Sequence, residues 1–186
     1  MREIILFHHA QGLTDGVAAF ADRLRAAGHT VHTPDLFEGR TFDTVEAGVA
    51  HAQEIGFDTV AARGVAAAER LPAEVVYAGM SLGVIPAEQL VVTRPGARGA
   101  LFLHSAMPTS EFGGPWPVGV GLQIHAMTED PWFDEDRPYA EQLVAEAGGE
   151  LFSYPGRGHL FTDSSLAEYD AGATDLVLER AAALLG

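Results

Sequence analysis

The stretch EVVYAGMSLGVIPAEQLVVT, residues 74–93, decides the fold of this chain. Its first six residues form an apolar run of strand length, and residues 82–93 carry the apolar spacing of a helix. Pro86 falls close to the first turn of that helix, where a missing N–H is tolerated. The pentapeptide Gly-x-Ser-x-Gly at residues 79–83 joins the two elements. The stretch therefore predicts a buried strand, a tight turn that presents Ser81, and a helix.

The spacing within this pentapeptide has a physical reason. Gly79 and Gly83 carry no side chain, so the strand and the helix can approach each other on either side of a strained turn. Ser81 would then sit at the start of the helix, where the dipole and free N–H groups favour developing negative charge. The pattern is typical of a serine nucleophile, although a Ser-Gly turn without chemistry has the same sequence.

The rest of the chain alternates short apolar runs with longer amphipathic segments. Further strands are expected at residues 3–8, 30–33, 97–104, 118–127 and 150–154. Helices are expected at residues 15–27, 43–70 with a break near 56–58, 138–147 and 164–185. This alternation predicts an α/β fold, a three-layer α/β/α sandwich with about six mostly parallel strands and a minimal or absent cap. We expect one domain over residues 1–186.

The composition excludes several kinds of chemistry. The 186 residues include 26 acidic and 11 basic residues, all of them arginines, and the formal net charge is −15. The absence of cysteine and lysine excludes thiolate nucleophiles, cysteine-ligated metals and lysine Schiff bases. The acidity argues against nucleic acid and anionic membranes as partners, and no apolar run approaches the roughly 18 residues of a membrane span. We expect a cytoplasmic protein, and the sequence leaves its oligomeric state open.

A serine nucleophile needs a base, and the base needs an acid that orients it. Asp130 and His159 each follow a later expected strand, so both should lie with Ser81 at the carboxyl edge of a parallel sheet. Their order along the chain is that of hydrolases built on this turn. Glu129 is the alternative orienting acid.

With these segments the chain resembles the dienelactone hydrolase family of the α/β-hydrolases. The similarity extends from the first strand to the last helix, and its segments besides the turn are residues 7–13, 34–36, 125–132 and 158–161. The resemblance implies a catalytic triad of Ser81, Asp130 and His159. It also implies an oxyanion hole formed by the backbone N–H groups of Leu82 and of Ala10 or Gln11.

The chain departs from this family at three points. The best-known members use a cysteine nucleophile, where this chain has Ser81. They carry a glutamate after the first strand that partners the thiol, and the nearest position here is His9. They bind a substrate carboxylate with arginines, whereas Arg157 is the only arginine beside a triad residue. A small neutral ester or lactone is therefore the expected substrate.

Other residues are expected at the same edge of the sheet. The candidates for the substrate pocket are His9, His104, Trp116 and Trp132, although a structural role is the default for His104. The loop at residues 105–117 is either part of the site or a surface connection. No spacing typical of metal ligands is present, so we expect neither a metal nor another cofactor.

Together these features predict a small serine hydrolase that cleaves a carboxylic ester or lactone through an acyl-enzyme. Two alternatives remain at this point. The same triad could act on a thioester or an amide, or the chain could be a hydrolase-like protein that binds a small molecule without turnover.

Overall fold

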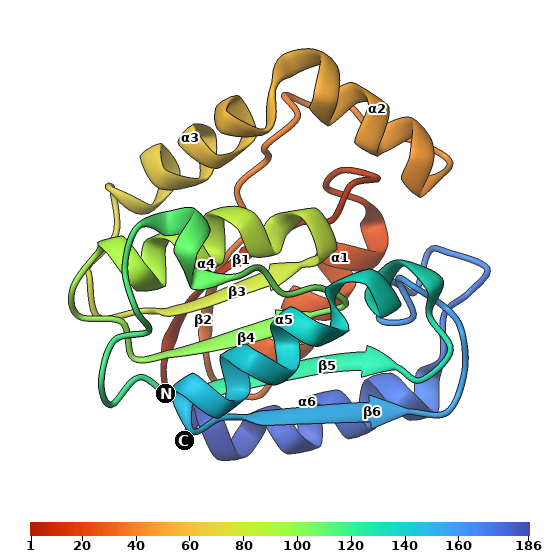
Figure 1. Ribbon diagram of the computed structural model, residues 1–186. Coiled ribbons are helices and arrows are strands. Elements are labelled where there is room, and N and C mark those ends of the chain that lie inside the picture. Colours follow the sequence, from red (N-terminus) through yellow and green to blue (C-terminus); the bar gives the residue numbers. More distant parts are fainter.

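The computed structural model describes residues 1–186 and contains one sheet of six parallel strands (Figure 1). The strands lie in the order β2-β1-β3-β4-β5-β6. Their bounds are Glu3–Phe7 (β1), Thr30–His32 (β2), Val76–Met80 (β3), Gly99–Leu103 (β4), Leu122–Met127 (β5) and Glu150–Tyr154 (β6). The expected α/β fold with parallel strands is confirmed.

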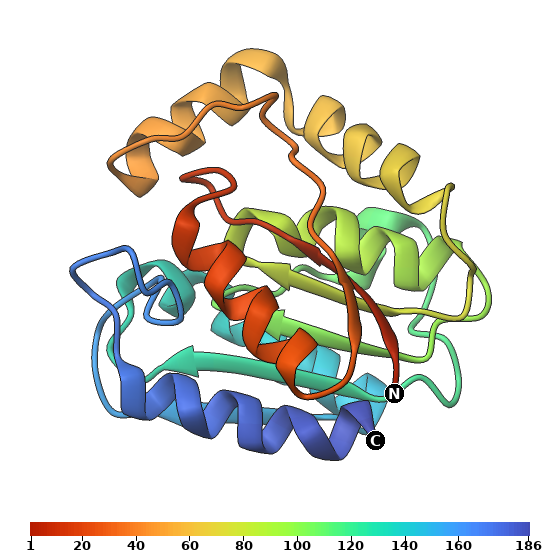
Figure 2. The ribbon, with the colours of Figure 1, turned by 180° about the vertical axis from the view of Figure 1, so that it is seen from behind.

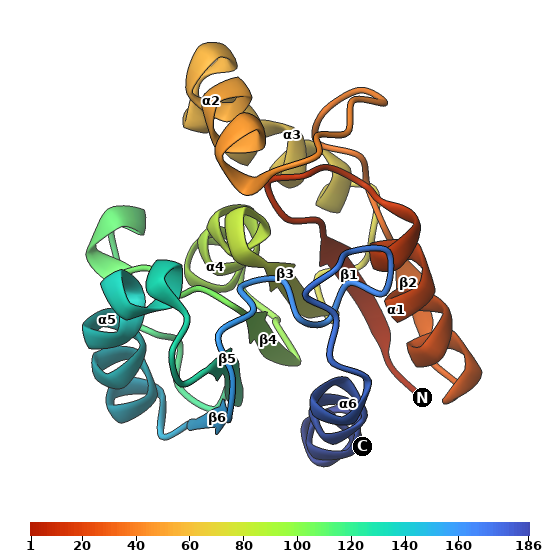
Figure 3. The same cartoon turned by 90° about the vertical axis from the view of Figure 1, so that its right-hand side faces the viewer.

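Six helices alternate with the strands. Their bounds are Asp15–Ala26 (α1), Val45–Ile55 (α2), Phe57–Ala68 (α3), Val84–Thr93 (α4), Pro131–Ala147 (α5) and Ala171–Leu185 (α6). Helices α4 and α5 cover one face of the sheet and α1 and α6 the other, as Figure 3 shows end-on and Figure 2 from behind. Helices α2 and α3 lie outside α4, against which α3 packs. None of the six combines the length and apolar character needed to cross a bilayer.

Burial explains why strands β1, β3 and β4 lack an alternation of polar and apolar residues. One cluster of buried apolar side chains fills the space between the sheet and α4 and α5, and a second fills the space under α1 and α6. Strands β1, β3 and β4 are thus covered on both faces and read as nearly continuous apolar runs, and β5 is buried along its whole length although it includes Gln123 and His125. Because all six strands are parallel, the loops after them meet at one edge, the carboxyl edge of the sheet.

Helix α5 begins earlier than the sequence predicts. The expected start was residue 138, but the helix begins at Pro131. The Asp130 side chain caps it by accepting a hydrogen bond from the Trp132 N–H at 3.0 Å. Pro131 occupies the first turn, and Pro138 is accommodated inside the helix. Two prolines each resembled a helix start, and the capping carboxylate decides between them.

Two other element boundaries also differ from those that the sequence predicts. The helix expected over residues 164–185 begins at Ala171, because Asp170 is its cap and accepts from the Ala173 N–H. The preceding residues form turns. The strand expected from residue 118 begins at Leu122. The break expected near residues 56–58 is confirmed, since Gly56 separates α2 from α3 with φ of 89°.

Candidate active site

The turn after β3 has the strained geometry that the glycine spacing predicts. Ser81 has φ of +48°, a conformation uncommon for residues other than glycine. A Cβ at Gly79 would lie 2.4 Å from the Gly83 carbonyl oxygen, and a Cβ at Gly83 would lie 2.4 Å from that of Phe7. Only glycine fits at either position, so β3, the turn and the end of β1 are packed backbone to backbone.

Three of the predicted residues form a hydrogen-bonded chain at the carboxyl edge. Ser81 Oγ lies 2.8 Å from His159 Nε2, and His159 Nδ1 lies 2.7 Å from Asp130 Oδ2. Asp130 is fully buried, and its ionised carboxylate can only accept. His159 therefore carries its proton on Nδ1, which leaves the Nε2 lone pair for the Ser81 hydroxyl proton.

The structure also separates the two candidate acids. Asp130 contacts His159, whereas the Glu129 side chain is exposed. The Glu129 backbone N–H donates to the Gly156 carbonyl at 2.9 Å, which places this residue in the turn and directs its carboxylate to solvent.

Glu168 holds the His159 loop, a role that the sequence does not predict. Its carboxylate accepts the N–H groups of His159 at 2.8 Å and Leu160 at 3.1 Å. A Cβ on Gly158 would lie 2.9 Å from the Glu168 carbonyl oxygen, so glycine is needed where the two segments meet. The only sequence signal was the Gly158-His159 pair.

Two N–H groups of the loop after β1, residues 8–13 (the β1 loop), were candidates for the oxyanion hole. The Gln11 N–H donates to His9 Nδ1 at 3.2 Å, whereas the Ala10 N–H forms no hydrogen bond within the protein. Helix α2 presses on this loop, because a Cβ at Gly48 would lie 1.8 Å from the Ala10 carbonyl oxygen. Of the two groups, Ala10 has the free donor.

His9 does not form an open pocket wall. It is fully buried, and its Nε2 lies 2.7 Å from Asp163 Oδ2. The same carboxylate accepts the hydroxyl groups of Thr14 and Ser165. Burial favours neutral Asp163, but the hydrogen bonds from these partners outweigh it and lower the pKa of Asp163 to about 2. Asp163 had no sequence signal of its own.

The other pocket candidates differ in placement. His104 is fully buried, its Nε2 is 2.8 Å from Thr162 Oγ1, and its ring centre is 5.9 Å from that of His159. Burial and then the charge of His159 lower the pKa of His104 well below its usual value. Trp132 is 38% exposed and its ring also lies 5.9 Å from that of His159. Of these two, Trp132 is accessible to a ligand.

Trp116 does not join the group at the carboxyl edge. Its indole Nε1–H donates to the Val120 carbonyl at 2.8 Å, and its backbone N–H donates to Glu146 near the end of α5. Both partners lie where strands begin, because α5 runs antiparallel to the sheet (Figure 1). Trp116 is buried in the core against Phe102. The expected pocket role is corrected accordingly: this tryptophan closes the core beneath the loop at residues 105–117.

A second carboxyl group, that of Asp136, lies near the triad. Asp136 on α5 accepts the Ser105 hydroxyl at 2.5 Å, and burial raises the pKa of its carboxyl. No arginine contacts Ser81, His159 or Asp130. Arg157 is exposed and forms no ion pair. The site therefore lacks the cation that would hold a substrate carboxylate.

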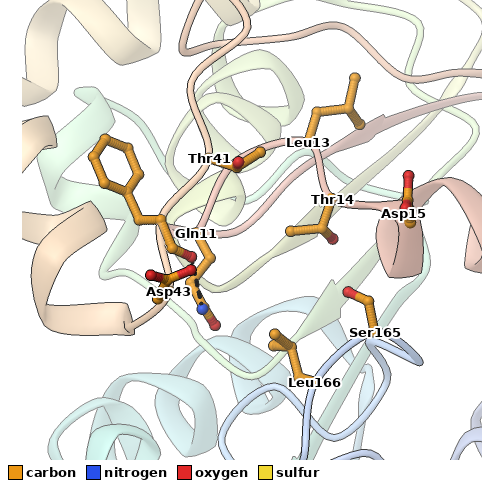
Figure 4. Close-up of a pocket in the computed structure, with 9 residues that line it drawn as sticks. Gln11, Leu13, Thr14, Asp15, Thr41, Asp43, Ser165 and Leu166 are labelled. Carbon is orange, nitrogen blue, oxygen red and sulfur yellow. Dashed lines mark hydrogen bonds between the residues drawn. The ribbon is translucent and has the colours of Figure 1, made fainter.

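Two cavities border these elements. One of about 330 Å³ lies between the β1 loop, residues 41–43 and residues 165–166, and is lined mainly by polar groups (Figure 4). Another of about 710 Å³ lies between α3, α4 and residues 107–113. Neither is lined by Ser81 or His159. No group of three or more acidic or histidine side chains is arranged to hold a metal ion.

Comparison with known proteins shows the family and the fold of the chain. The sequence model of the dienelactone hydrolase family matches residues 1–186. No curated protein matches the chain. The fold is similar to that of the dienelactone hydrolase-like promiscuous phosphotriesterase P91 from metagenomic libraries, with 17% identity, a TM-score of 0.78, and coverage of 100% of this chain and 85% of that one.

Two further solved structures share the fold. A candidate dienelactone hydrolase from Klebsiella pneumoniae has 16% identity and a TM-score of 0.75, with coverage of 100% of this chain and 86% of that one. The thioesterase RedJ of the prodiginine pathway of Streptomyces coelicolor has 14% identity and a TM-score of 0.63, with coverage of 97% and 84%. At these identities, the structural similarity establishes the α/β-hydrolase fold.

Proposed function

Because the chain belongs to the dienelactone hydrolase family and is a hydrolase of the α/β class, we propose that it cleaves a carboxylic ester or a lactone with a serine nucleophile. The observation that carries the proposal is the chain of contacts from Ser81 through His159 to Asp130, at 2.8 and 2.7 Å. A nucleophile, a base and an orienting acid within hydrogen-bond reach are what acyl transfer requires.

In the first half-reaction, Ser81 Oγ attacks the substrate carbonyl carbon while His159 Nε2 takes the hydroxyl proton. Asp130 keeps the other proton on Nδ1 and stabilises the imidazolium. The backbone N–H groups of Leu82 and Ala10 bind the oxyanion; in a protease, losing one such donor costs roughly 3–4 kcal/mol. The bond to the leaving alkoxide then breaks, and His159 protonates that oxygen.

In the second half-reaction, water replaces the alcohol. His159 takes a proton from the water as it attacks the acyl carbon, and returns that proton to Ser81 Oγ when the acyl–oxygen bond breaks. The products are a carboxylic acid and an alcohol. In a lactone both remain on one molecule, so the product is a hydroxy acid.

The charges around the site support a small neutral substrate. A substrate carboxylate near Ser81 would meet the carboxylates of Asp130 and Asp136 without an arginine to offset them. Arginines usually provide such recognition through paired hydrogen bonds. We expect a nitrophenyl ester with a carboxylated acyl chain to show at least about tenfold lower kcat/KM than its neutral counterpart.

The second candidate function is hydrolysis of a thioester or a phosphotriester by the same residues. It is favoured by the names of two structures with this fold, a thioesterase and a promiscuous phosphotriesterase. Parallel assays with a short-chain nitrophenyl ester, the matching thioester and diethyl nitrophenyl phosphate separate the possibilities. Highest kcat/KM for the oxygen ester is the expected result, and a higher value for either rival would replace our assignment.

Labelling with a fluorophosphonate tests the nucleophile directly. Intact mass should show one adduct on the wild-type protein and none on Ser81→Ala. Ser110→Ala is the matched control, because Ser110 is exposed and contacts no triad residue, and it should label fully. A folded wild-type protein that gains no Ser81-dependent adduct and turns over no ester would instead support the non-catalytic binding protein.

His159→Ala tests the base separately. Its kcat should fall by at least about 10³-fold, because the serine hydroxyl loses its proton acceptor. Full activity in this variant would rule out the role assigned to His159, even if Ser81 were confirmed by labelling.

A further inference from the structure

The site contains a second histidine–aspartate pair that the mechanism above does not use. His9 Nε2 and Asp163 Oδ2 are 2.7 Å apart, and both residues are fully buried. They come from opposite ends of the chain, 154 positions apart. Neither side chain contacts Ser81, His159 or Asp130 by a hydrogen bond. A buried carboxylate needs a reason to be there, because removing a charge from water is costly.

Its hydrogen bonds fix the protonation of His9. Asp163 is ionised, since hydrogen bonds hold its pKa at about 2, and so it only accepts. The proton of the neutral ring must therefore lie on His9 Nε2. That leaves a lone pair on Nδ1, which accepts the Gln11 N–H at 3.2 Å. Asp163 thus selects the tautomer that can hold Gln11.

The bond to Gln11 bears on the oxyanion hole. The Gln11 N–H is turned towards the His9 ring, while the N–H of the preceding residue, Ala10, remains free. Gln11 is also tied to Phe42 by two hydrogen bonds, from Phe42 N–H to the Gln11 carbonyl at 3.0 Å and from Gln11 Nε2 to the Phe42 carbonyl at 2.9 Å. Gln11, the residue after Ala10, is therefore held by His9 at its N–H and by Phe42 at its carbonyl and its side chain.

Asp163 connects this loop to the base. It lies four residues after His159 in the same turn segment, and it also accepts the Thr14 hydroxyl at the start of α1. Helix α1 approaches Asp163 so closely that a Cβ on Gly16 would lie 1.6 Å from the Asp163 carboxylate. The β1 loop, the start of α1 and the His159 loop are therefore joined at one buried carboxylate.

We propose that His9 and Asp163 are positioning residues that hold the Ala10 N–H in place for the oxyanion and fix its position relative to His159. This inference rests on the proposed serine hydrolase function. Neither residue touches the substrate; both act through Gln11, whose N–H is held by His9 one residue beyond the Ala10 N–H. His9 is nearest to the position at which the best-known members of the family carry a glutamate. The pair therefore gives this chain a different support for the loop after β1.

Nitrogen-15 NMR of the wild-type protein tests the pair without any substrate. Long-range ¹H–¹⁵N correlations distinguish the two neutral forms of a histidine ring. We expect His9 to show a protonated Nε2 and an unprotonated Nδ1 at neutral pH. Protonation on Nδ1 would overturn the proposal, because the Gln11 N–H could then not donate to the ring. This measurement stands whether or not the protein hydrolyses esters.

Kinetics of three variants test the role itself. Asp163→Asn keeps the shape but replaces one of the two acceptor oxygens with an NH₂ group, so the side chain can no longer accept from both His9 and Ser165. His9→Phe removes both ring nitrogens. Each should lower kcat for a neutral nitrophenyl ester by about 10- to 100-fold with KM within about threefold, because one oxyanion donor is misplaced. The double variant should lose little more than either single one, because the two residues act as a unit.

Asp175→Asn is the control for loss of one negative charge, since Asp175 is exposed and pairs with Arg23 on the surface. It should keep wild-type kcat and KM. Unchanged kcat in folded Asp163→Asn, or a loss carried by KM alone, would refute the positioning role. A wild-type protein without esterase activity would refute the proposed function instead, and the His9 tautomer would still decide whether the pair is built as described.

Discussion

Glu88 on α4 offers a quantitative test of the energetics of this fold. Its side chain is fully buried, Oε2 accepts the Met107 N–H at 3.1 Å, and Oε1 has no partner. Burial raises the pKa of Glu88 to about 8, and the nearby carboxylates of Glu146 and Asp136 add to the effect. At neutral pH the group is therefore mostly protonated in the folded protein and ionised in the unfolded chain.

The sign of the pH dependence follows from this difference. A group whose pKa is higher in the folded state stabilises that state fully below its unfolded pKa of 4.5, and the contribution is lost as pH rises towards 8. By pH 7 the loss amounts to about 3 kcal/mol, at 1.36 kcal/mol per pKa unit. Glu88→Gln keeps the shape and stays neutral at every pH, so it should avoid this loss.

Urea unfolding at pH 5, 7 and 8 provides the measurement. Glu88→Gln should match the wild type near pH 5 and exceed it by about 3 kcal/mol at pH 7, which corresponds to roughly 6–12 °C in Tm for a chain of this size. Glu141→Gln is the control, because Glu141 is exposed on the outer side of α5. If the free energy of unfolding changed with pH in the same way for Glu88→Gln and wild type, burial would not raise the pKa of Glu88 as described.

Three further outcomes are expected. The lowered pKa of Asp163 stabilises the fold by about 2 kcal/mol above pH 4, and this is lost as pH falls from 4 to 2; urea unfolding between pH 3 and 6 should therefore show a flatter curve for Asp163→Asn. Gly83→Ala forces backbone contacts at 2.4 Å. It should lower the free energy of unfolding by about 1–3 kcal/mol, measured by thermal unfolding, and kcat by about 10²-fold. Gly172→Ala is the control, because its Cβ approaches no atom closer than 3.5 Å, and it should leave both quantities near wild type. Asp130→Asn should lower kcat by about 10⁴-fold in steady-state assays, since it favours the wrong tautomer of the base; a change below tenfold would contradict the role of Asp130.

The sheet and the turn at Ser81 could be predicted because their signals are local. An apolar run that is covered on both faces has the same pattern whichever strands lie beside it. The two glycines are recognised by their spacing around the serine, although the contact that requires Gly83 is with the end of β1. The order of Ser81, Asp130 and His159 after successive strands was also enough to place them at one edge, since parallel strands all end there.

The parts that could not be predicted depend on pairs of residues far apart in the chain. Asp163 carries no signal of its own in the sequence, yet its carboxylate is engaged by His9, 154 positions away along the chain. Trp116 sits in a loop that leaves the carboxyl edge and returns to the start of β5, so its position in the sequence said nothing about which end it reaches. The residues next to Asp163 and Trp116 in the sequence do not indicate these distant contacts.

The position of β1 within the sheet has a consequence for how the chain is made. Ile4 pairs with Val31 on one side and Val76 on the other, and its face is completed by residues of α6 such as Val177. During synthesis the amino end leaves the ribosome first, so β1 must wait for partners that are translated much later. Parallel pairings between distant segments form slowly. We expect ester-cleaving activity to appear on nascent chains only once α6 has left the ribosome, with the apolar strand β1 dependent on protection from aggregation until then.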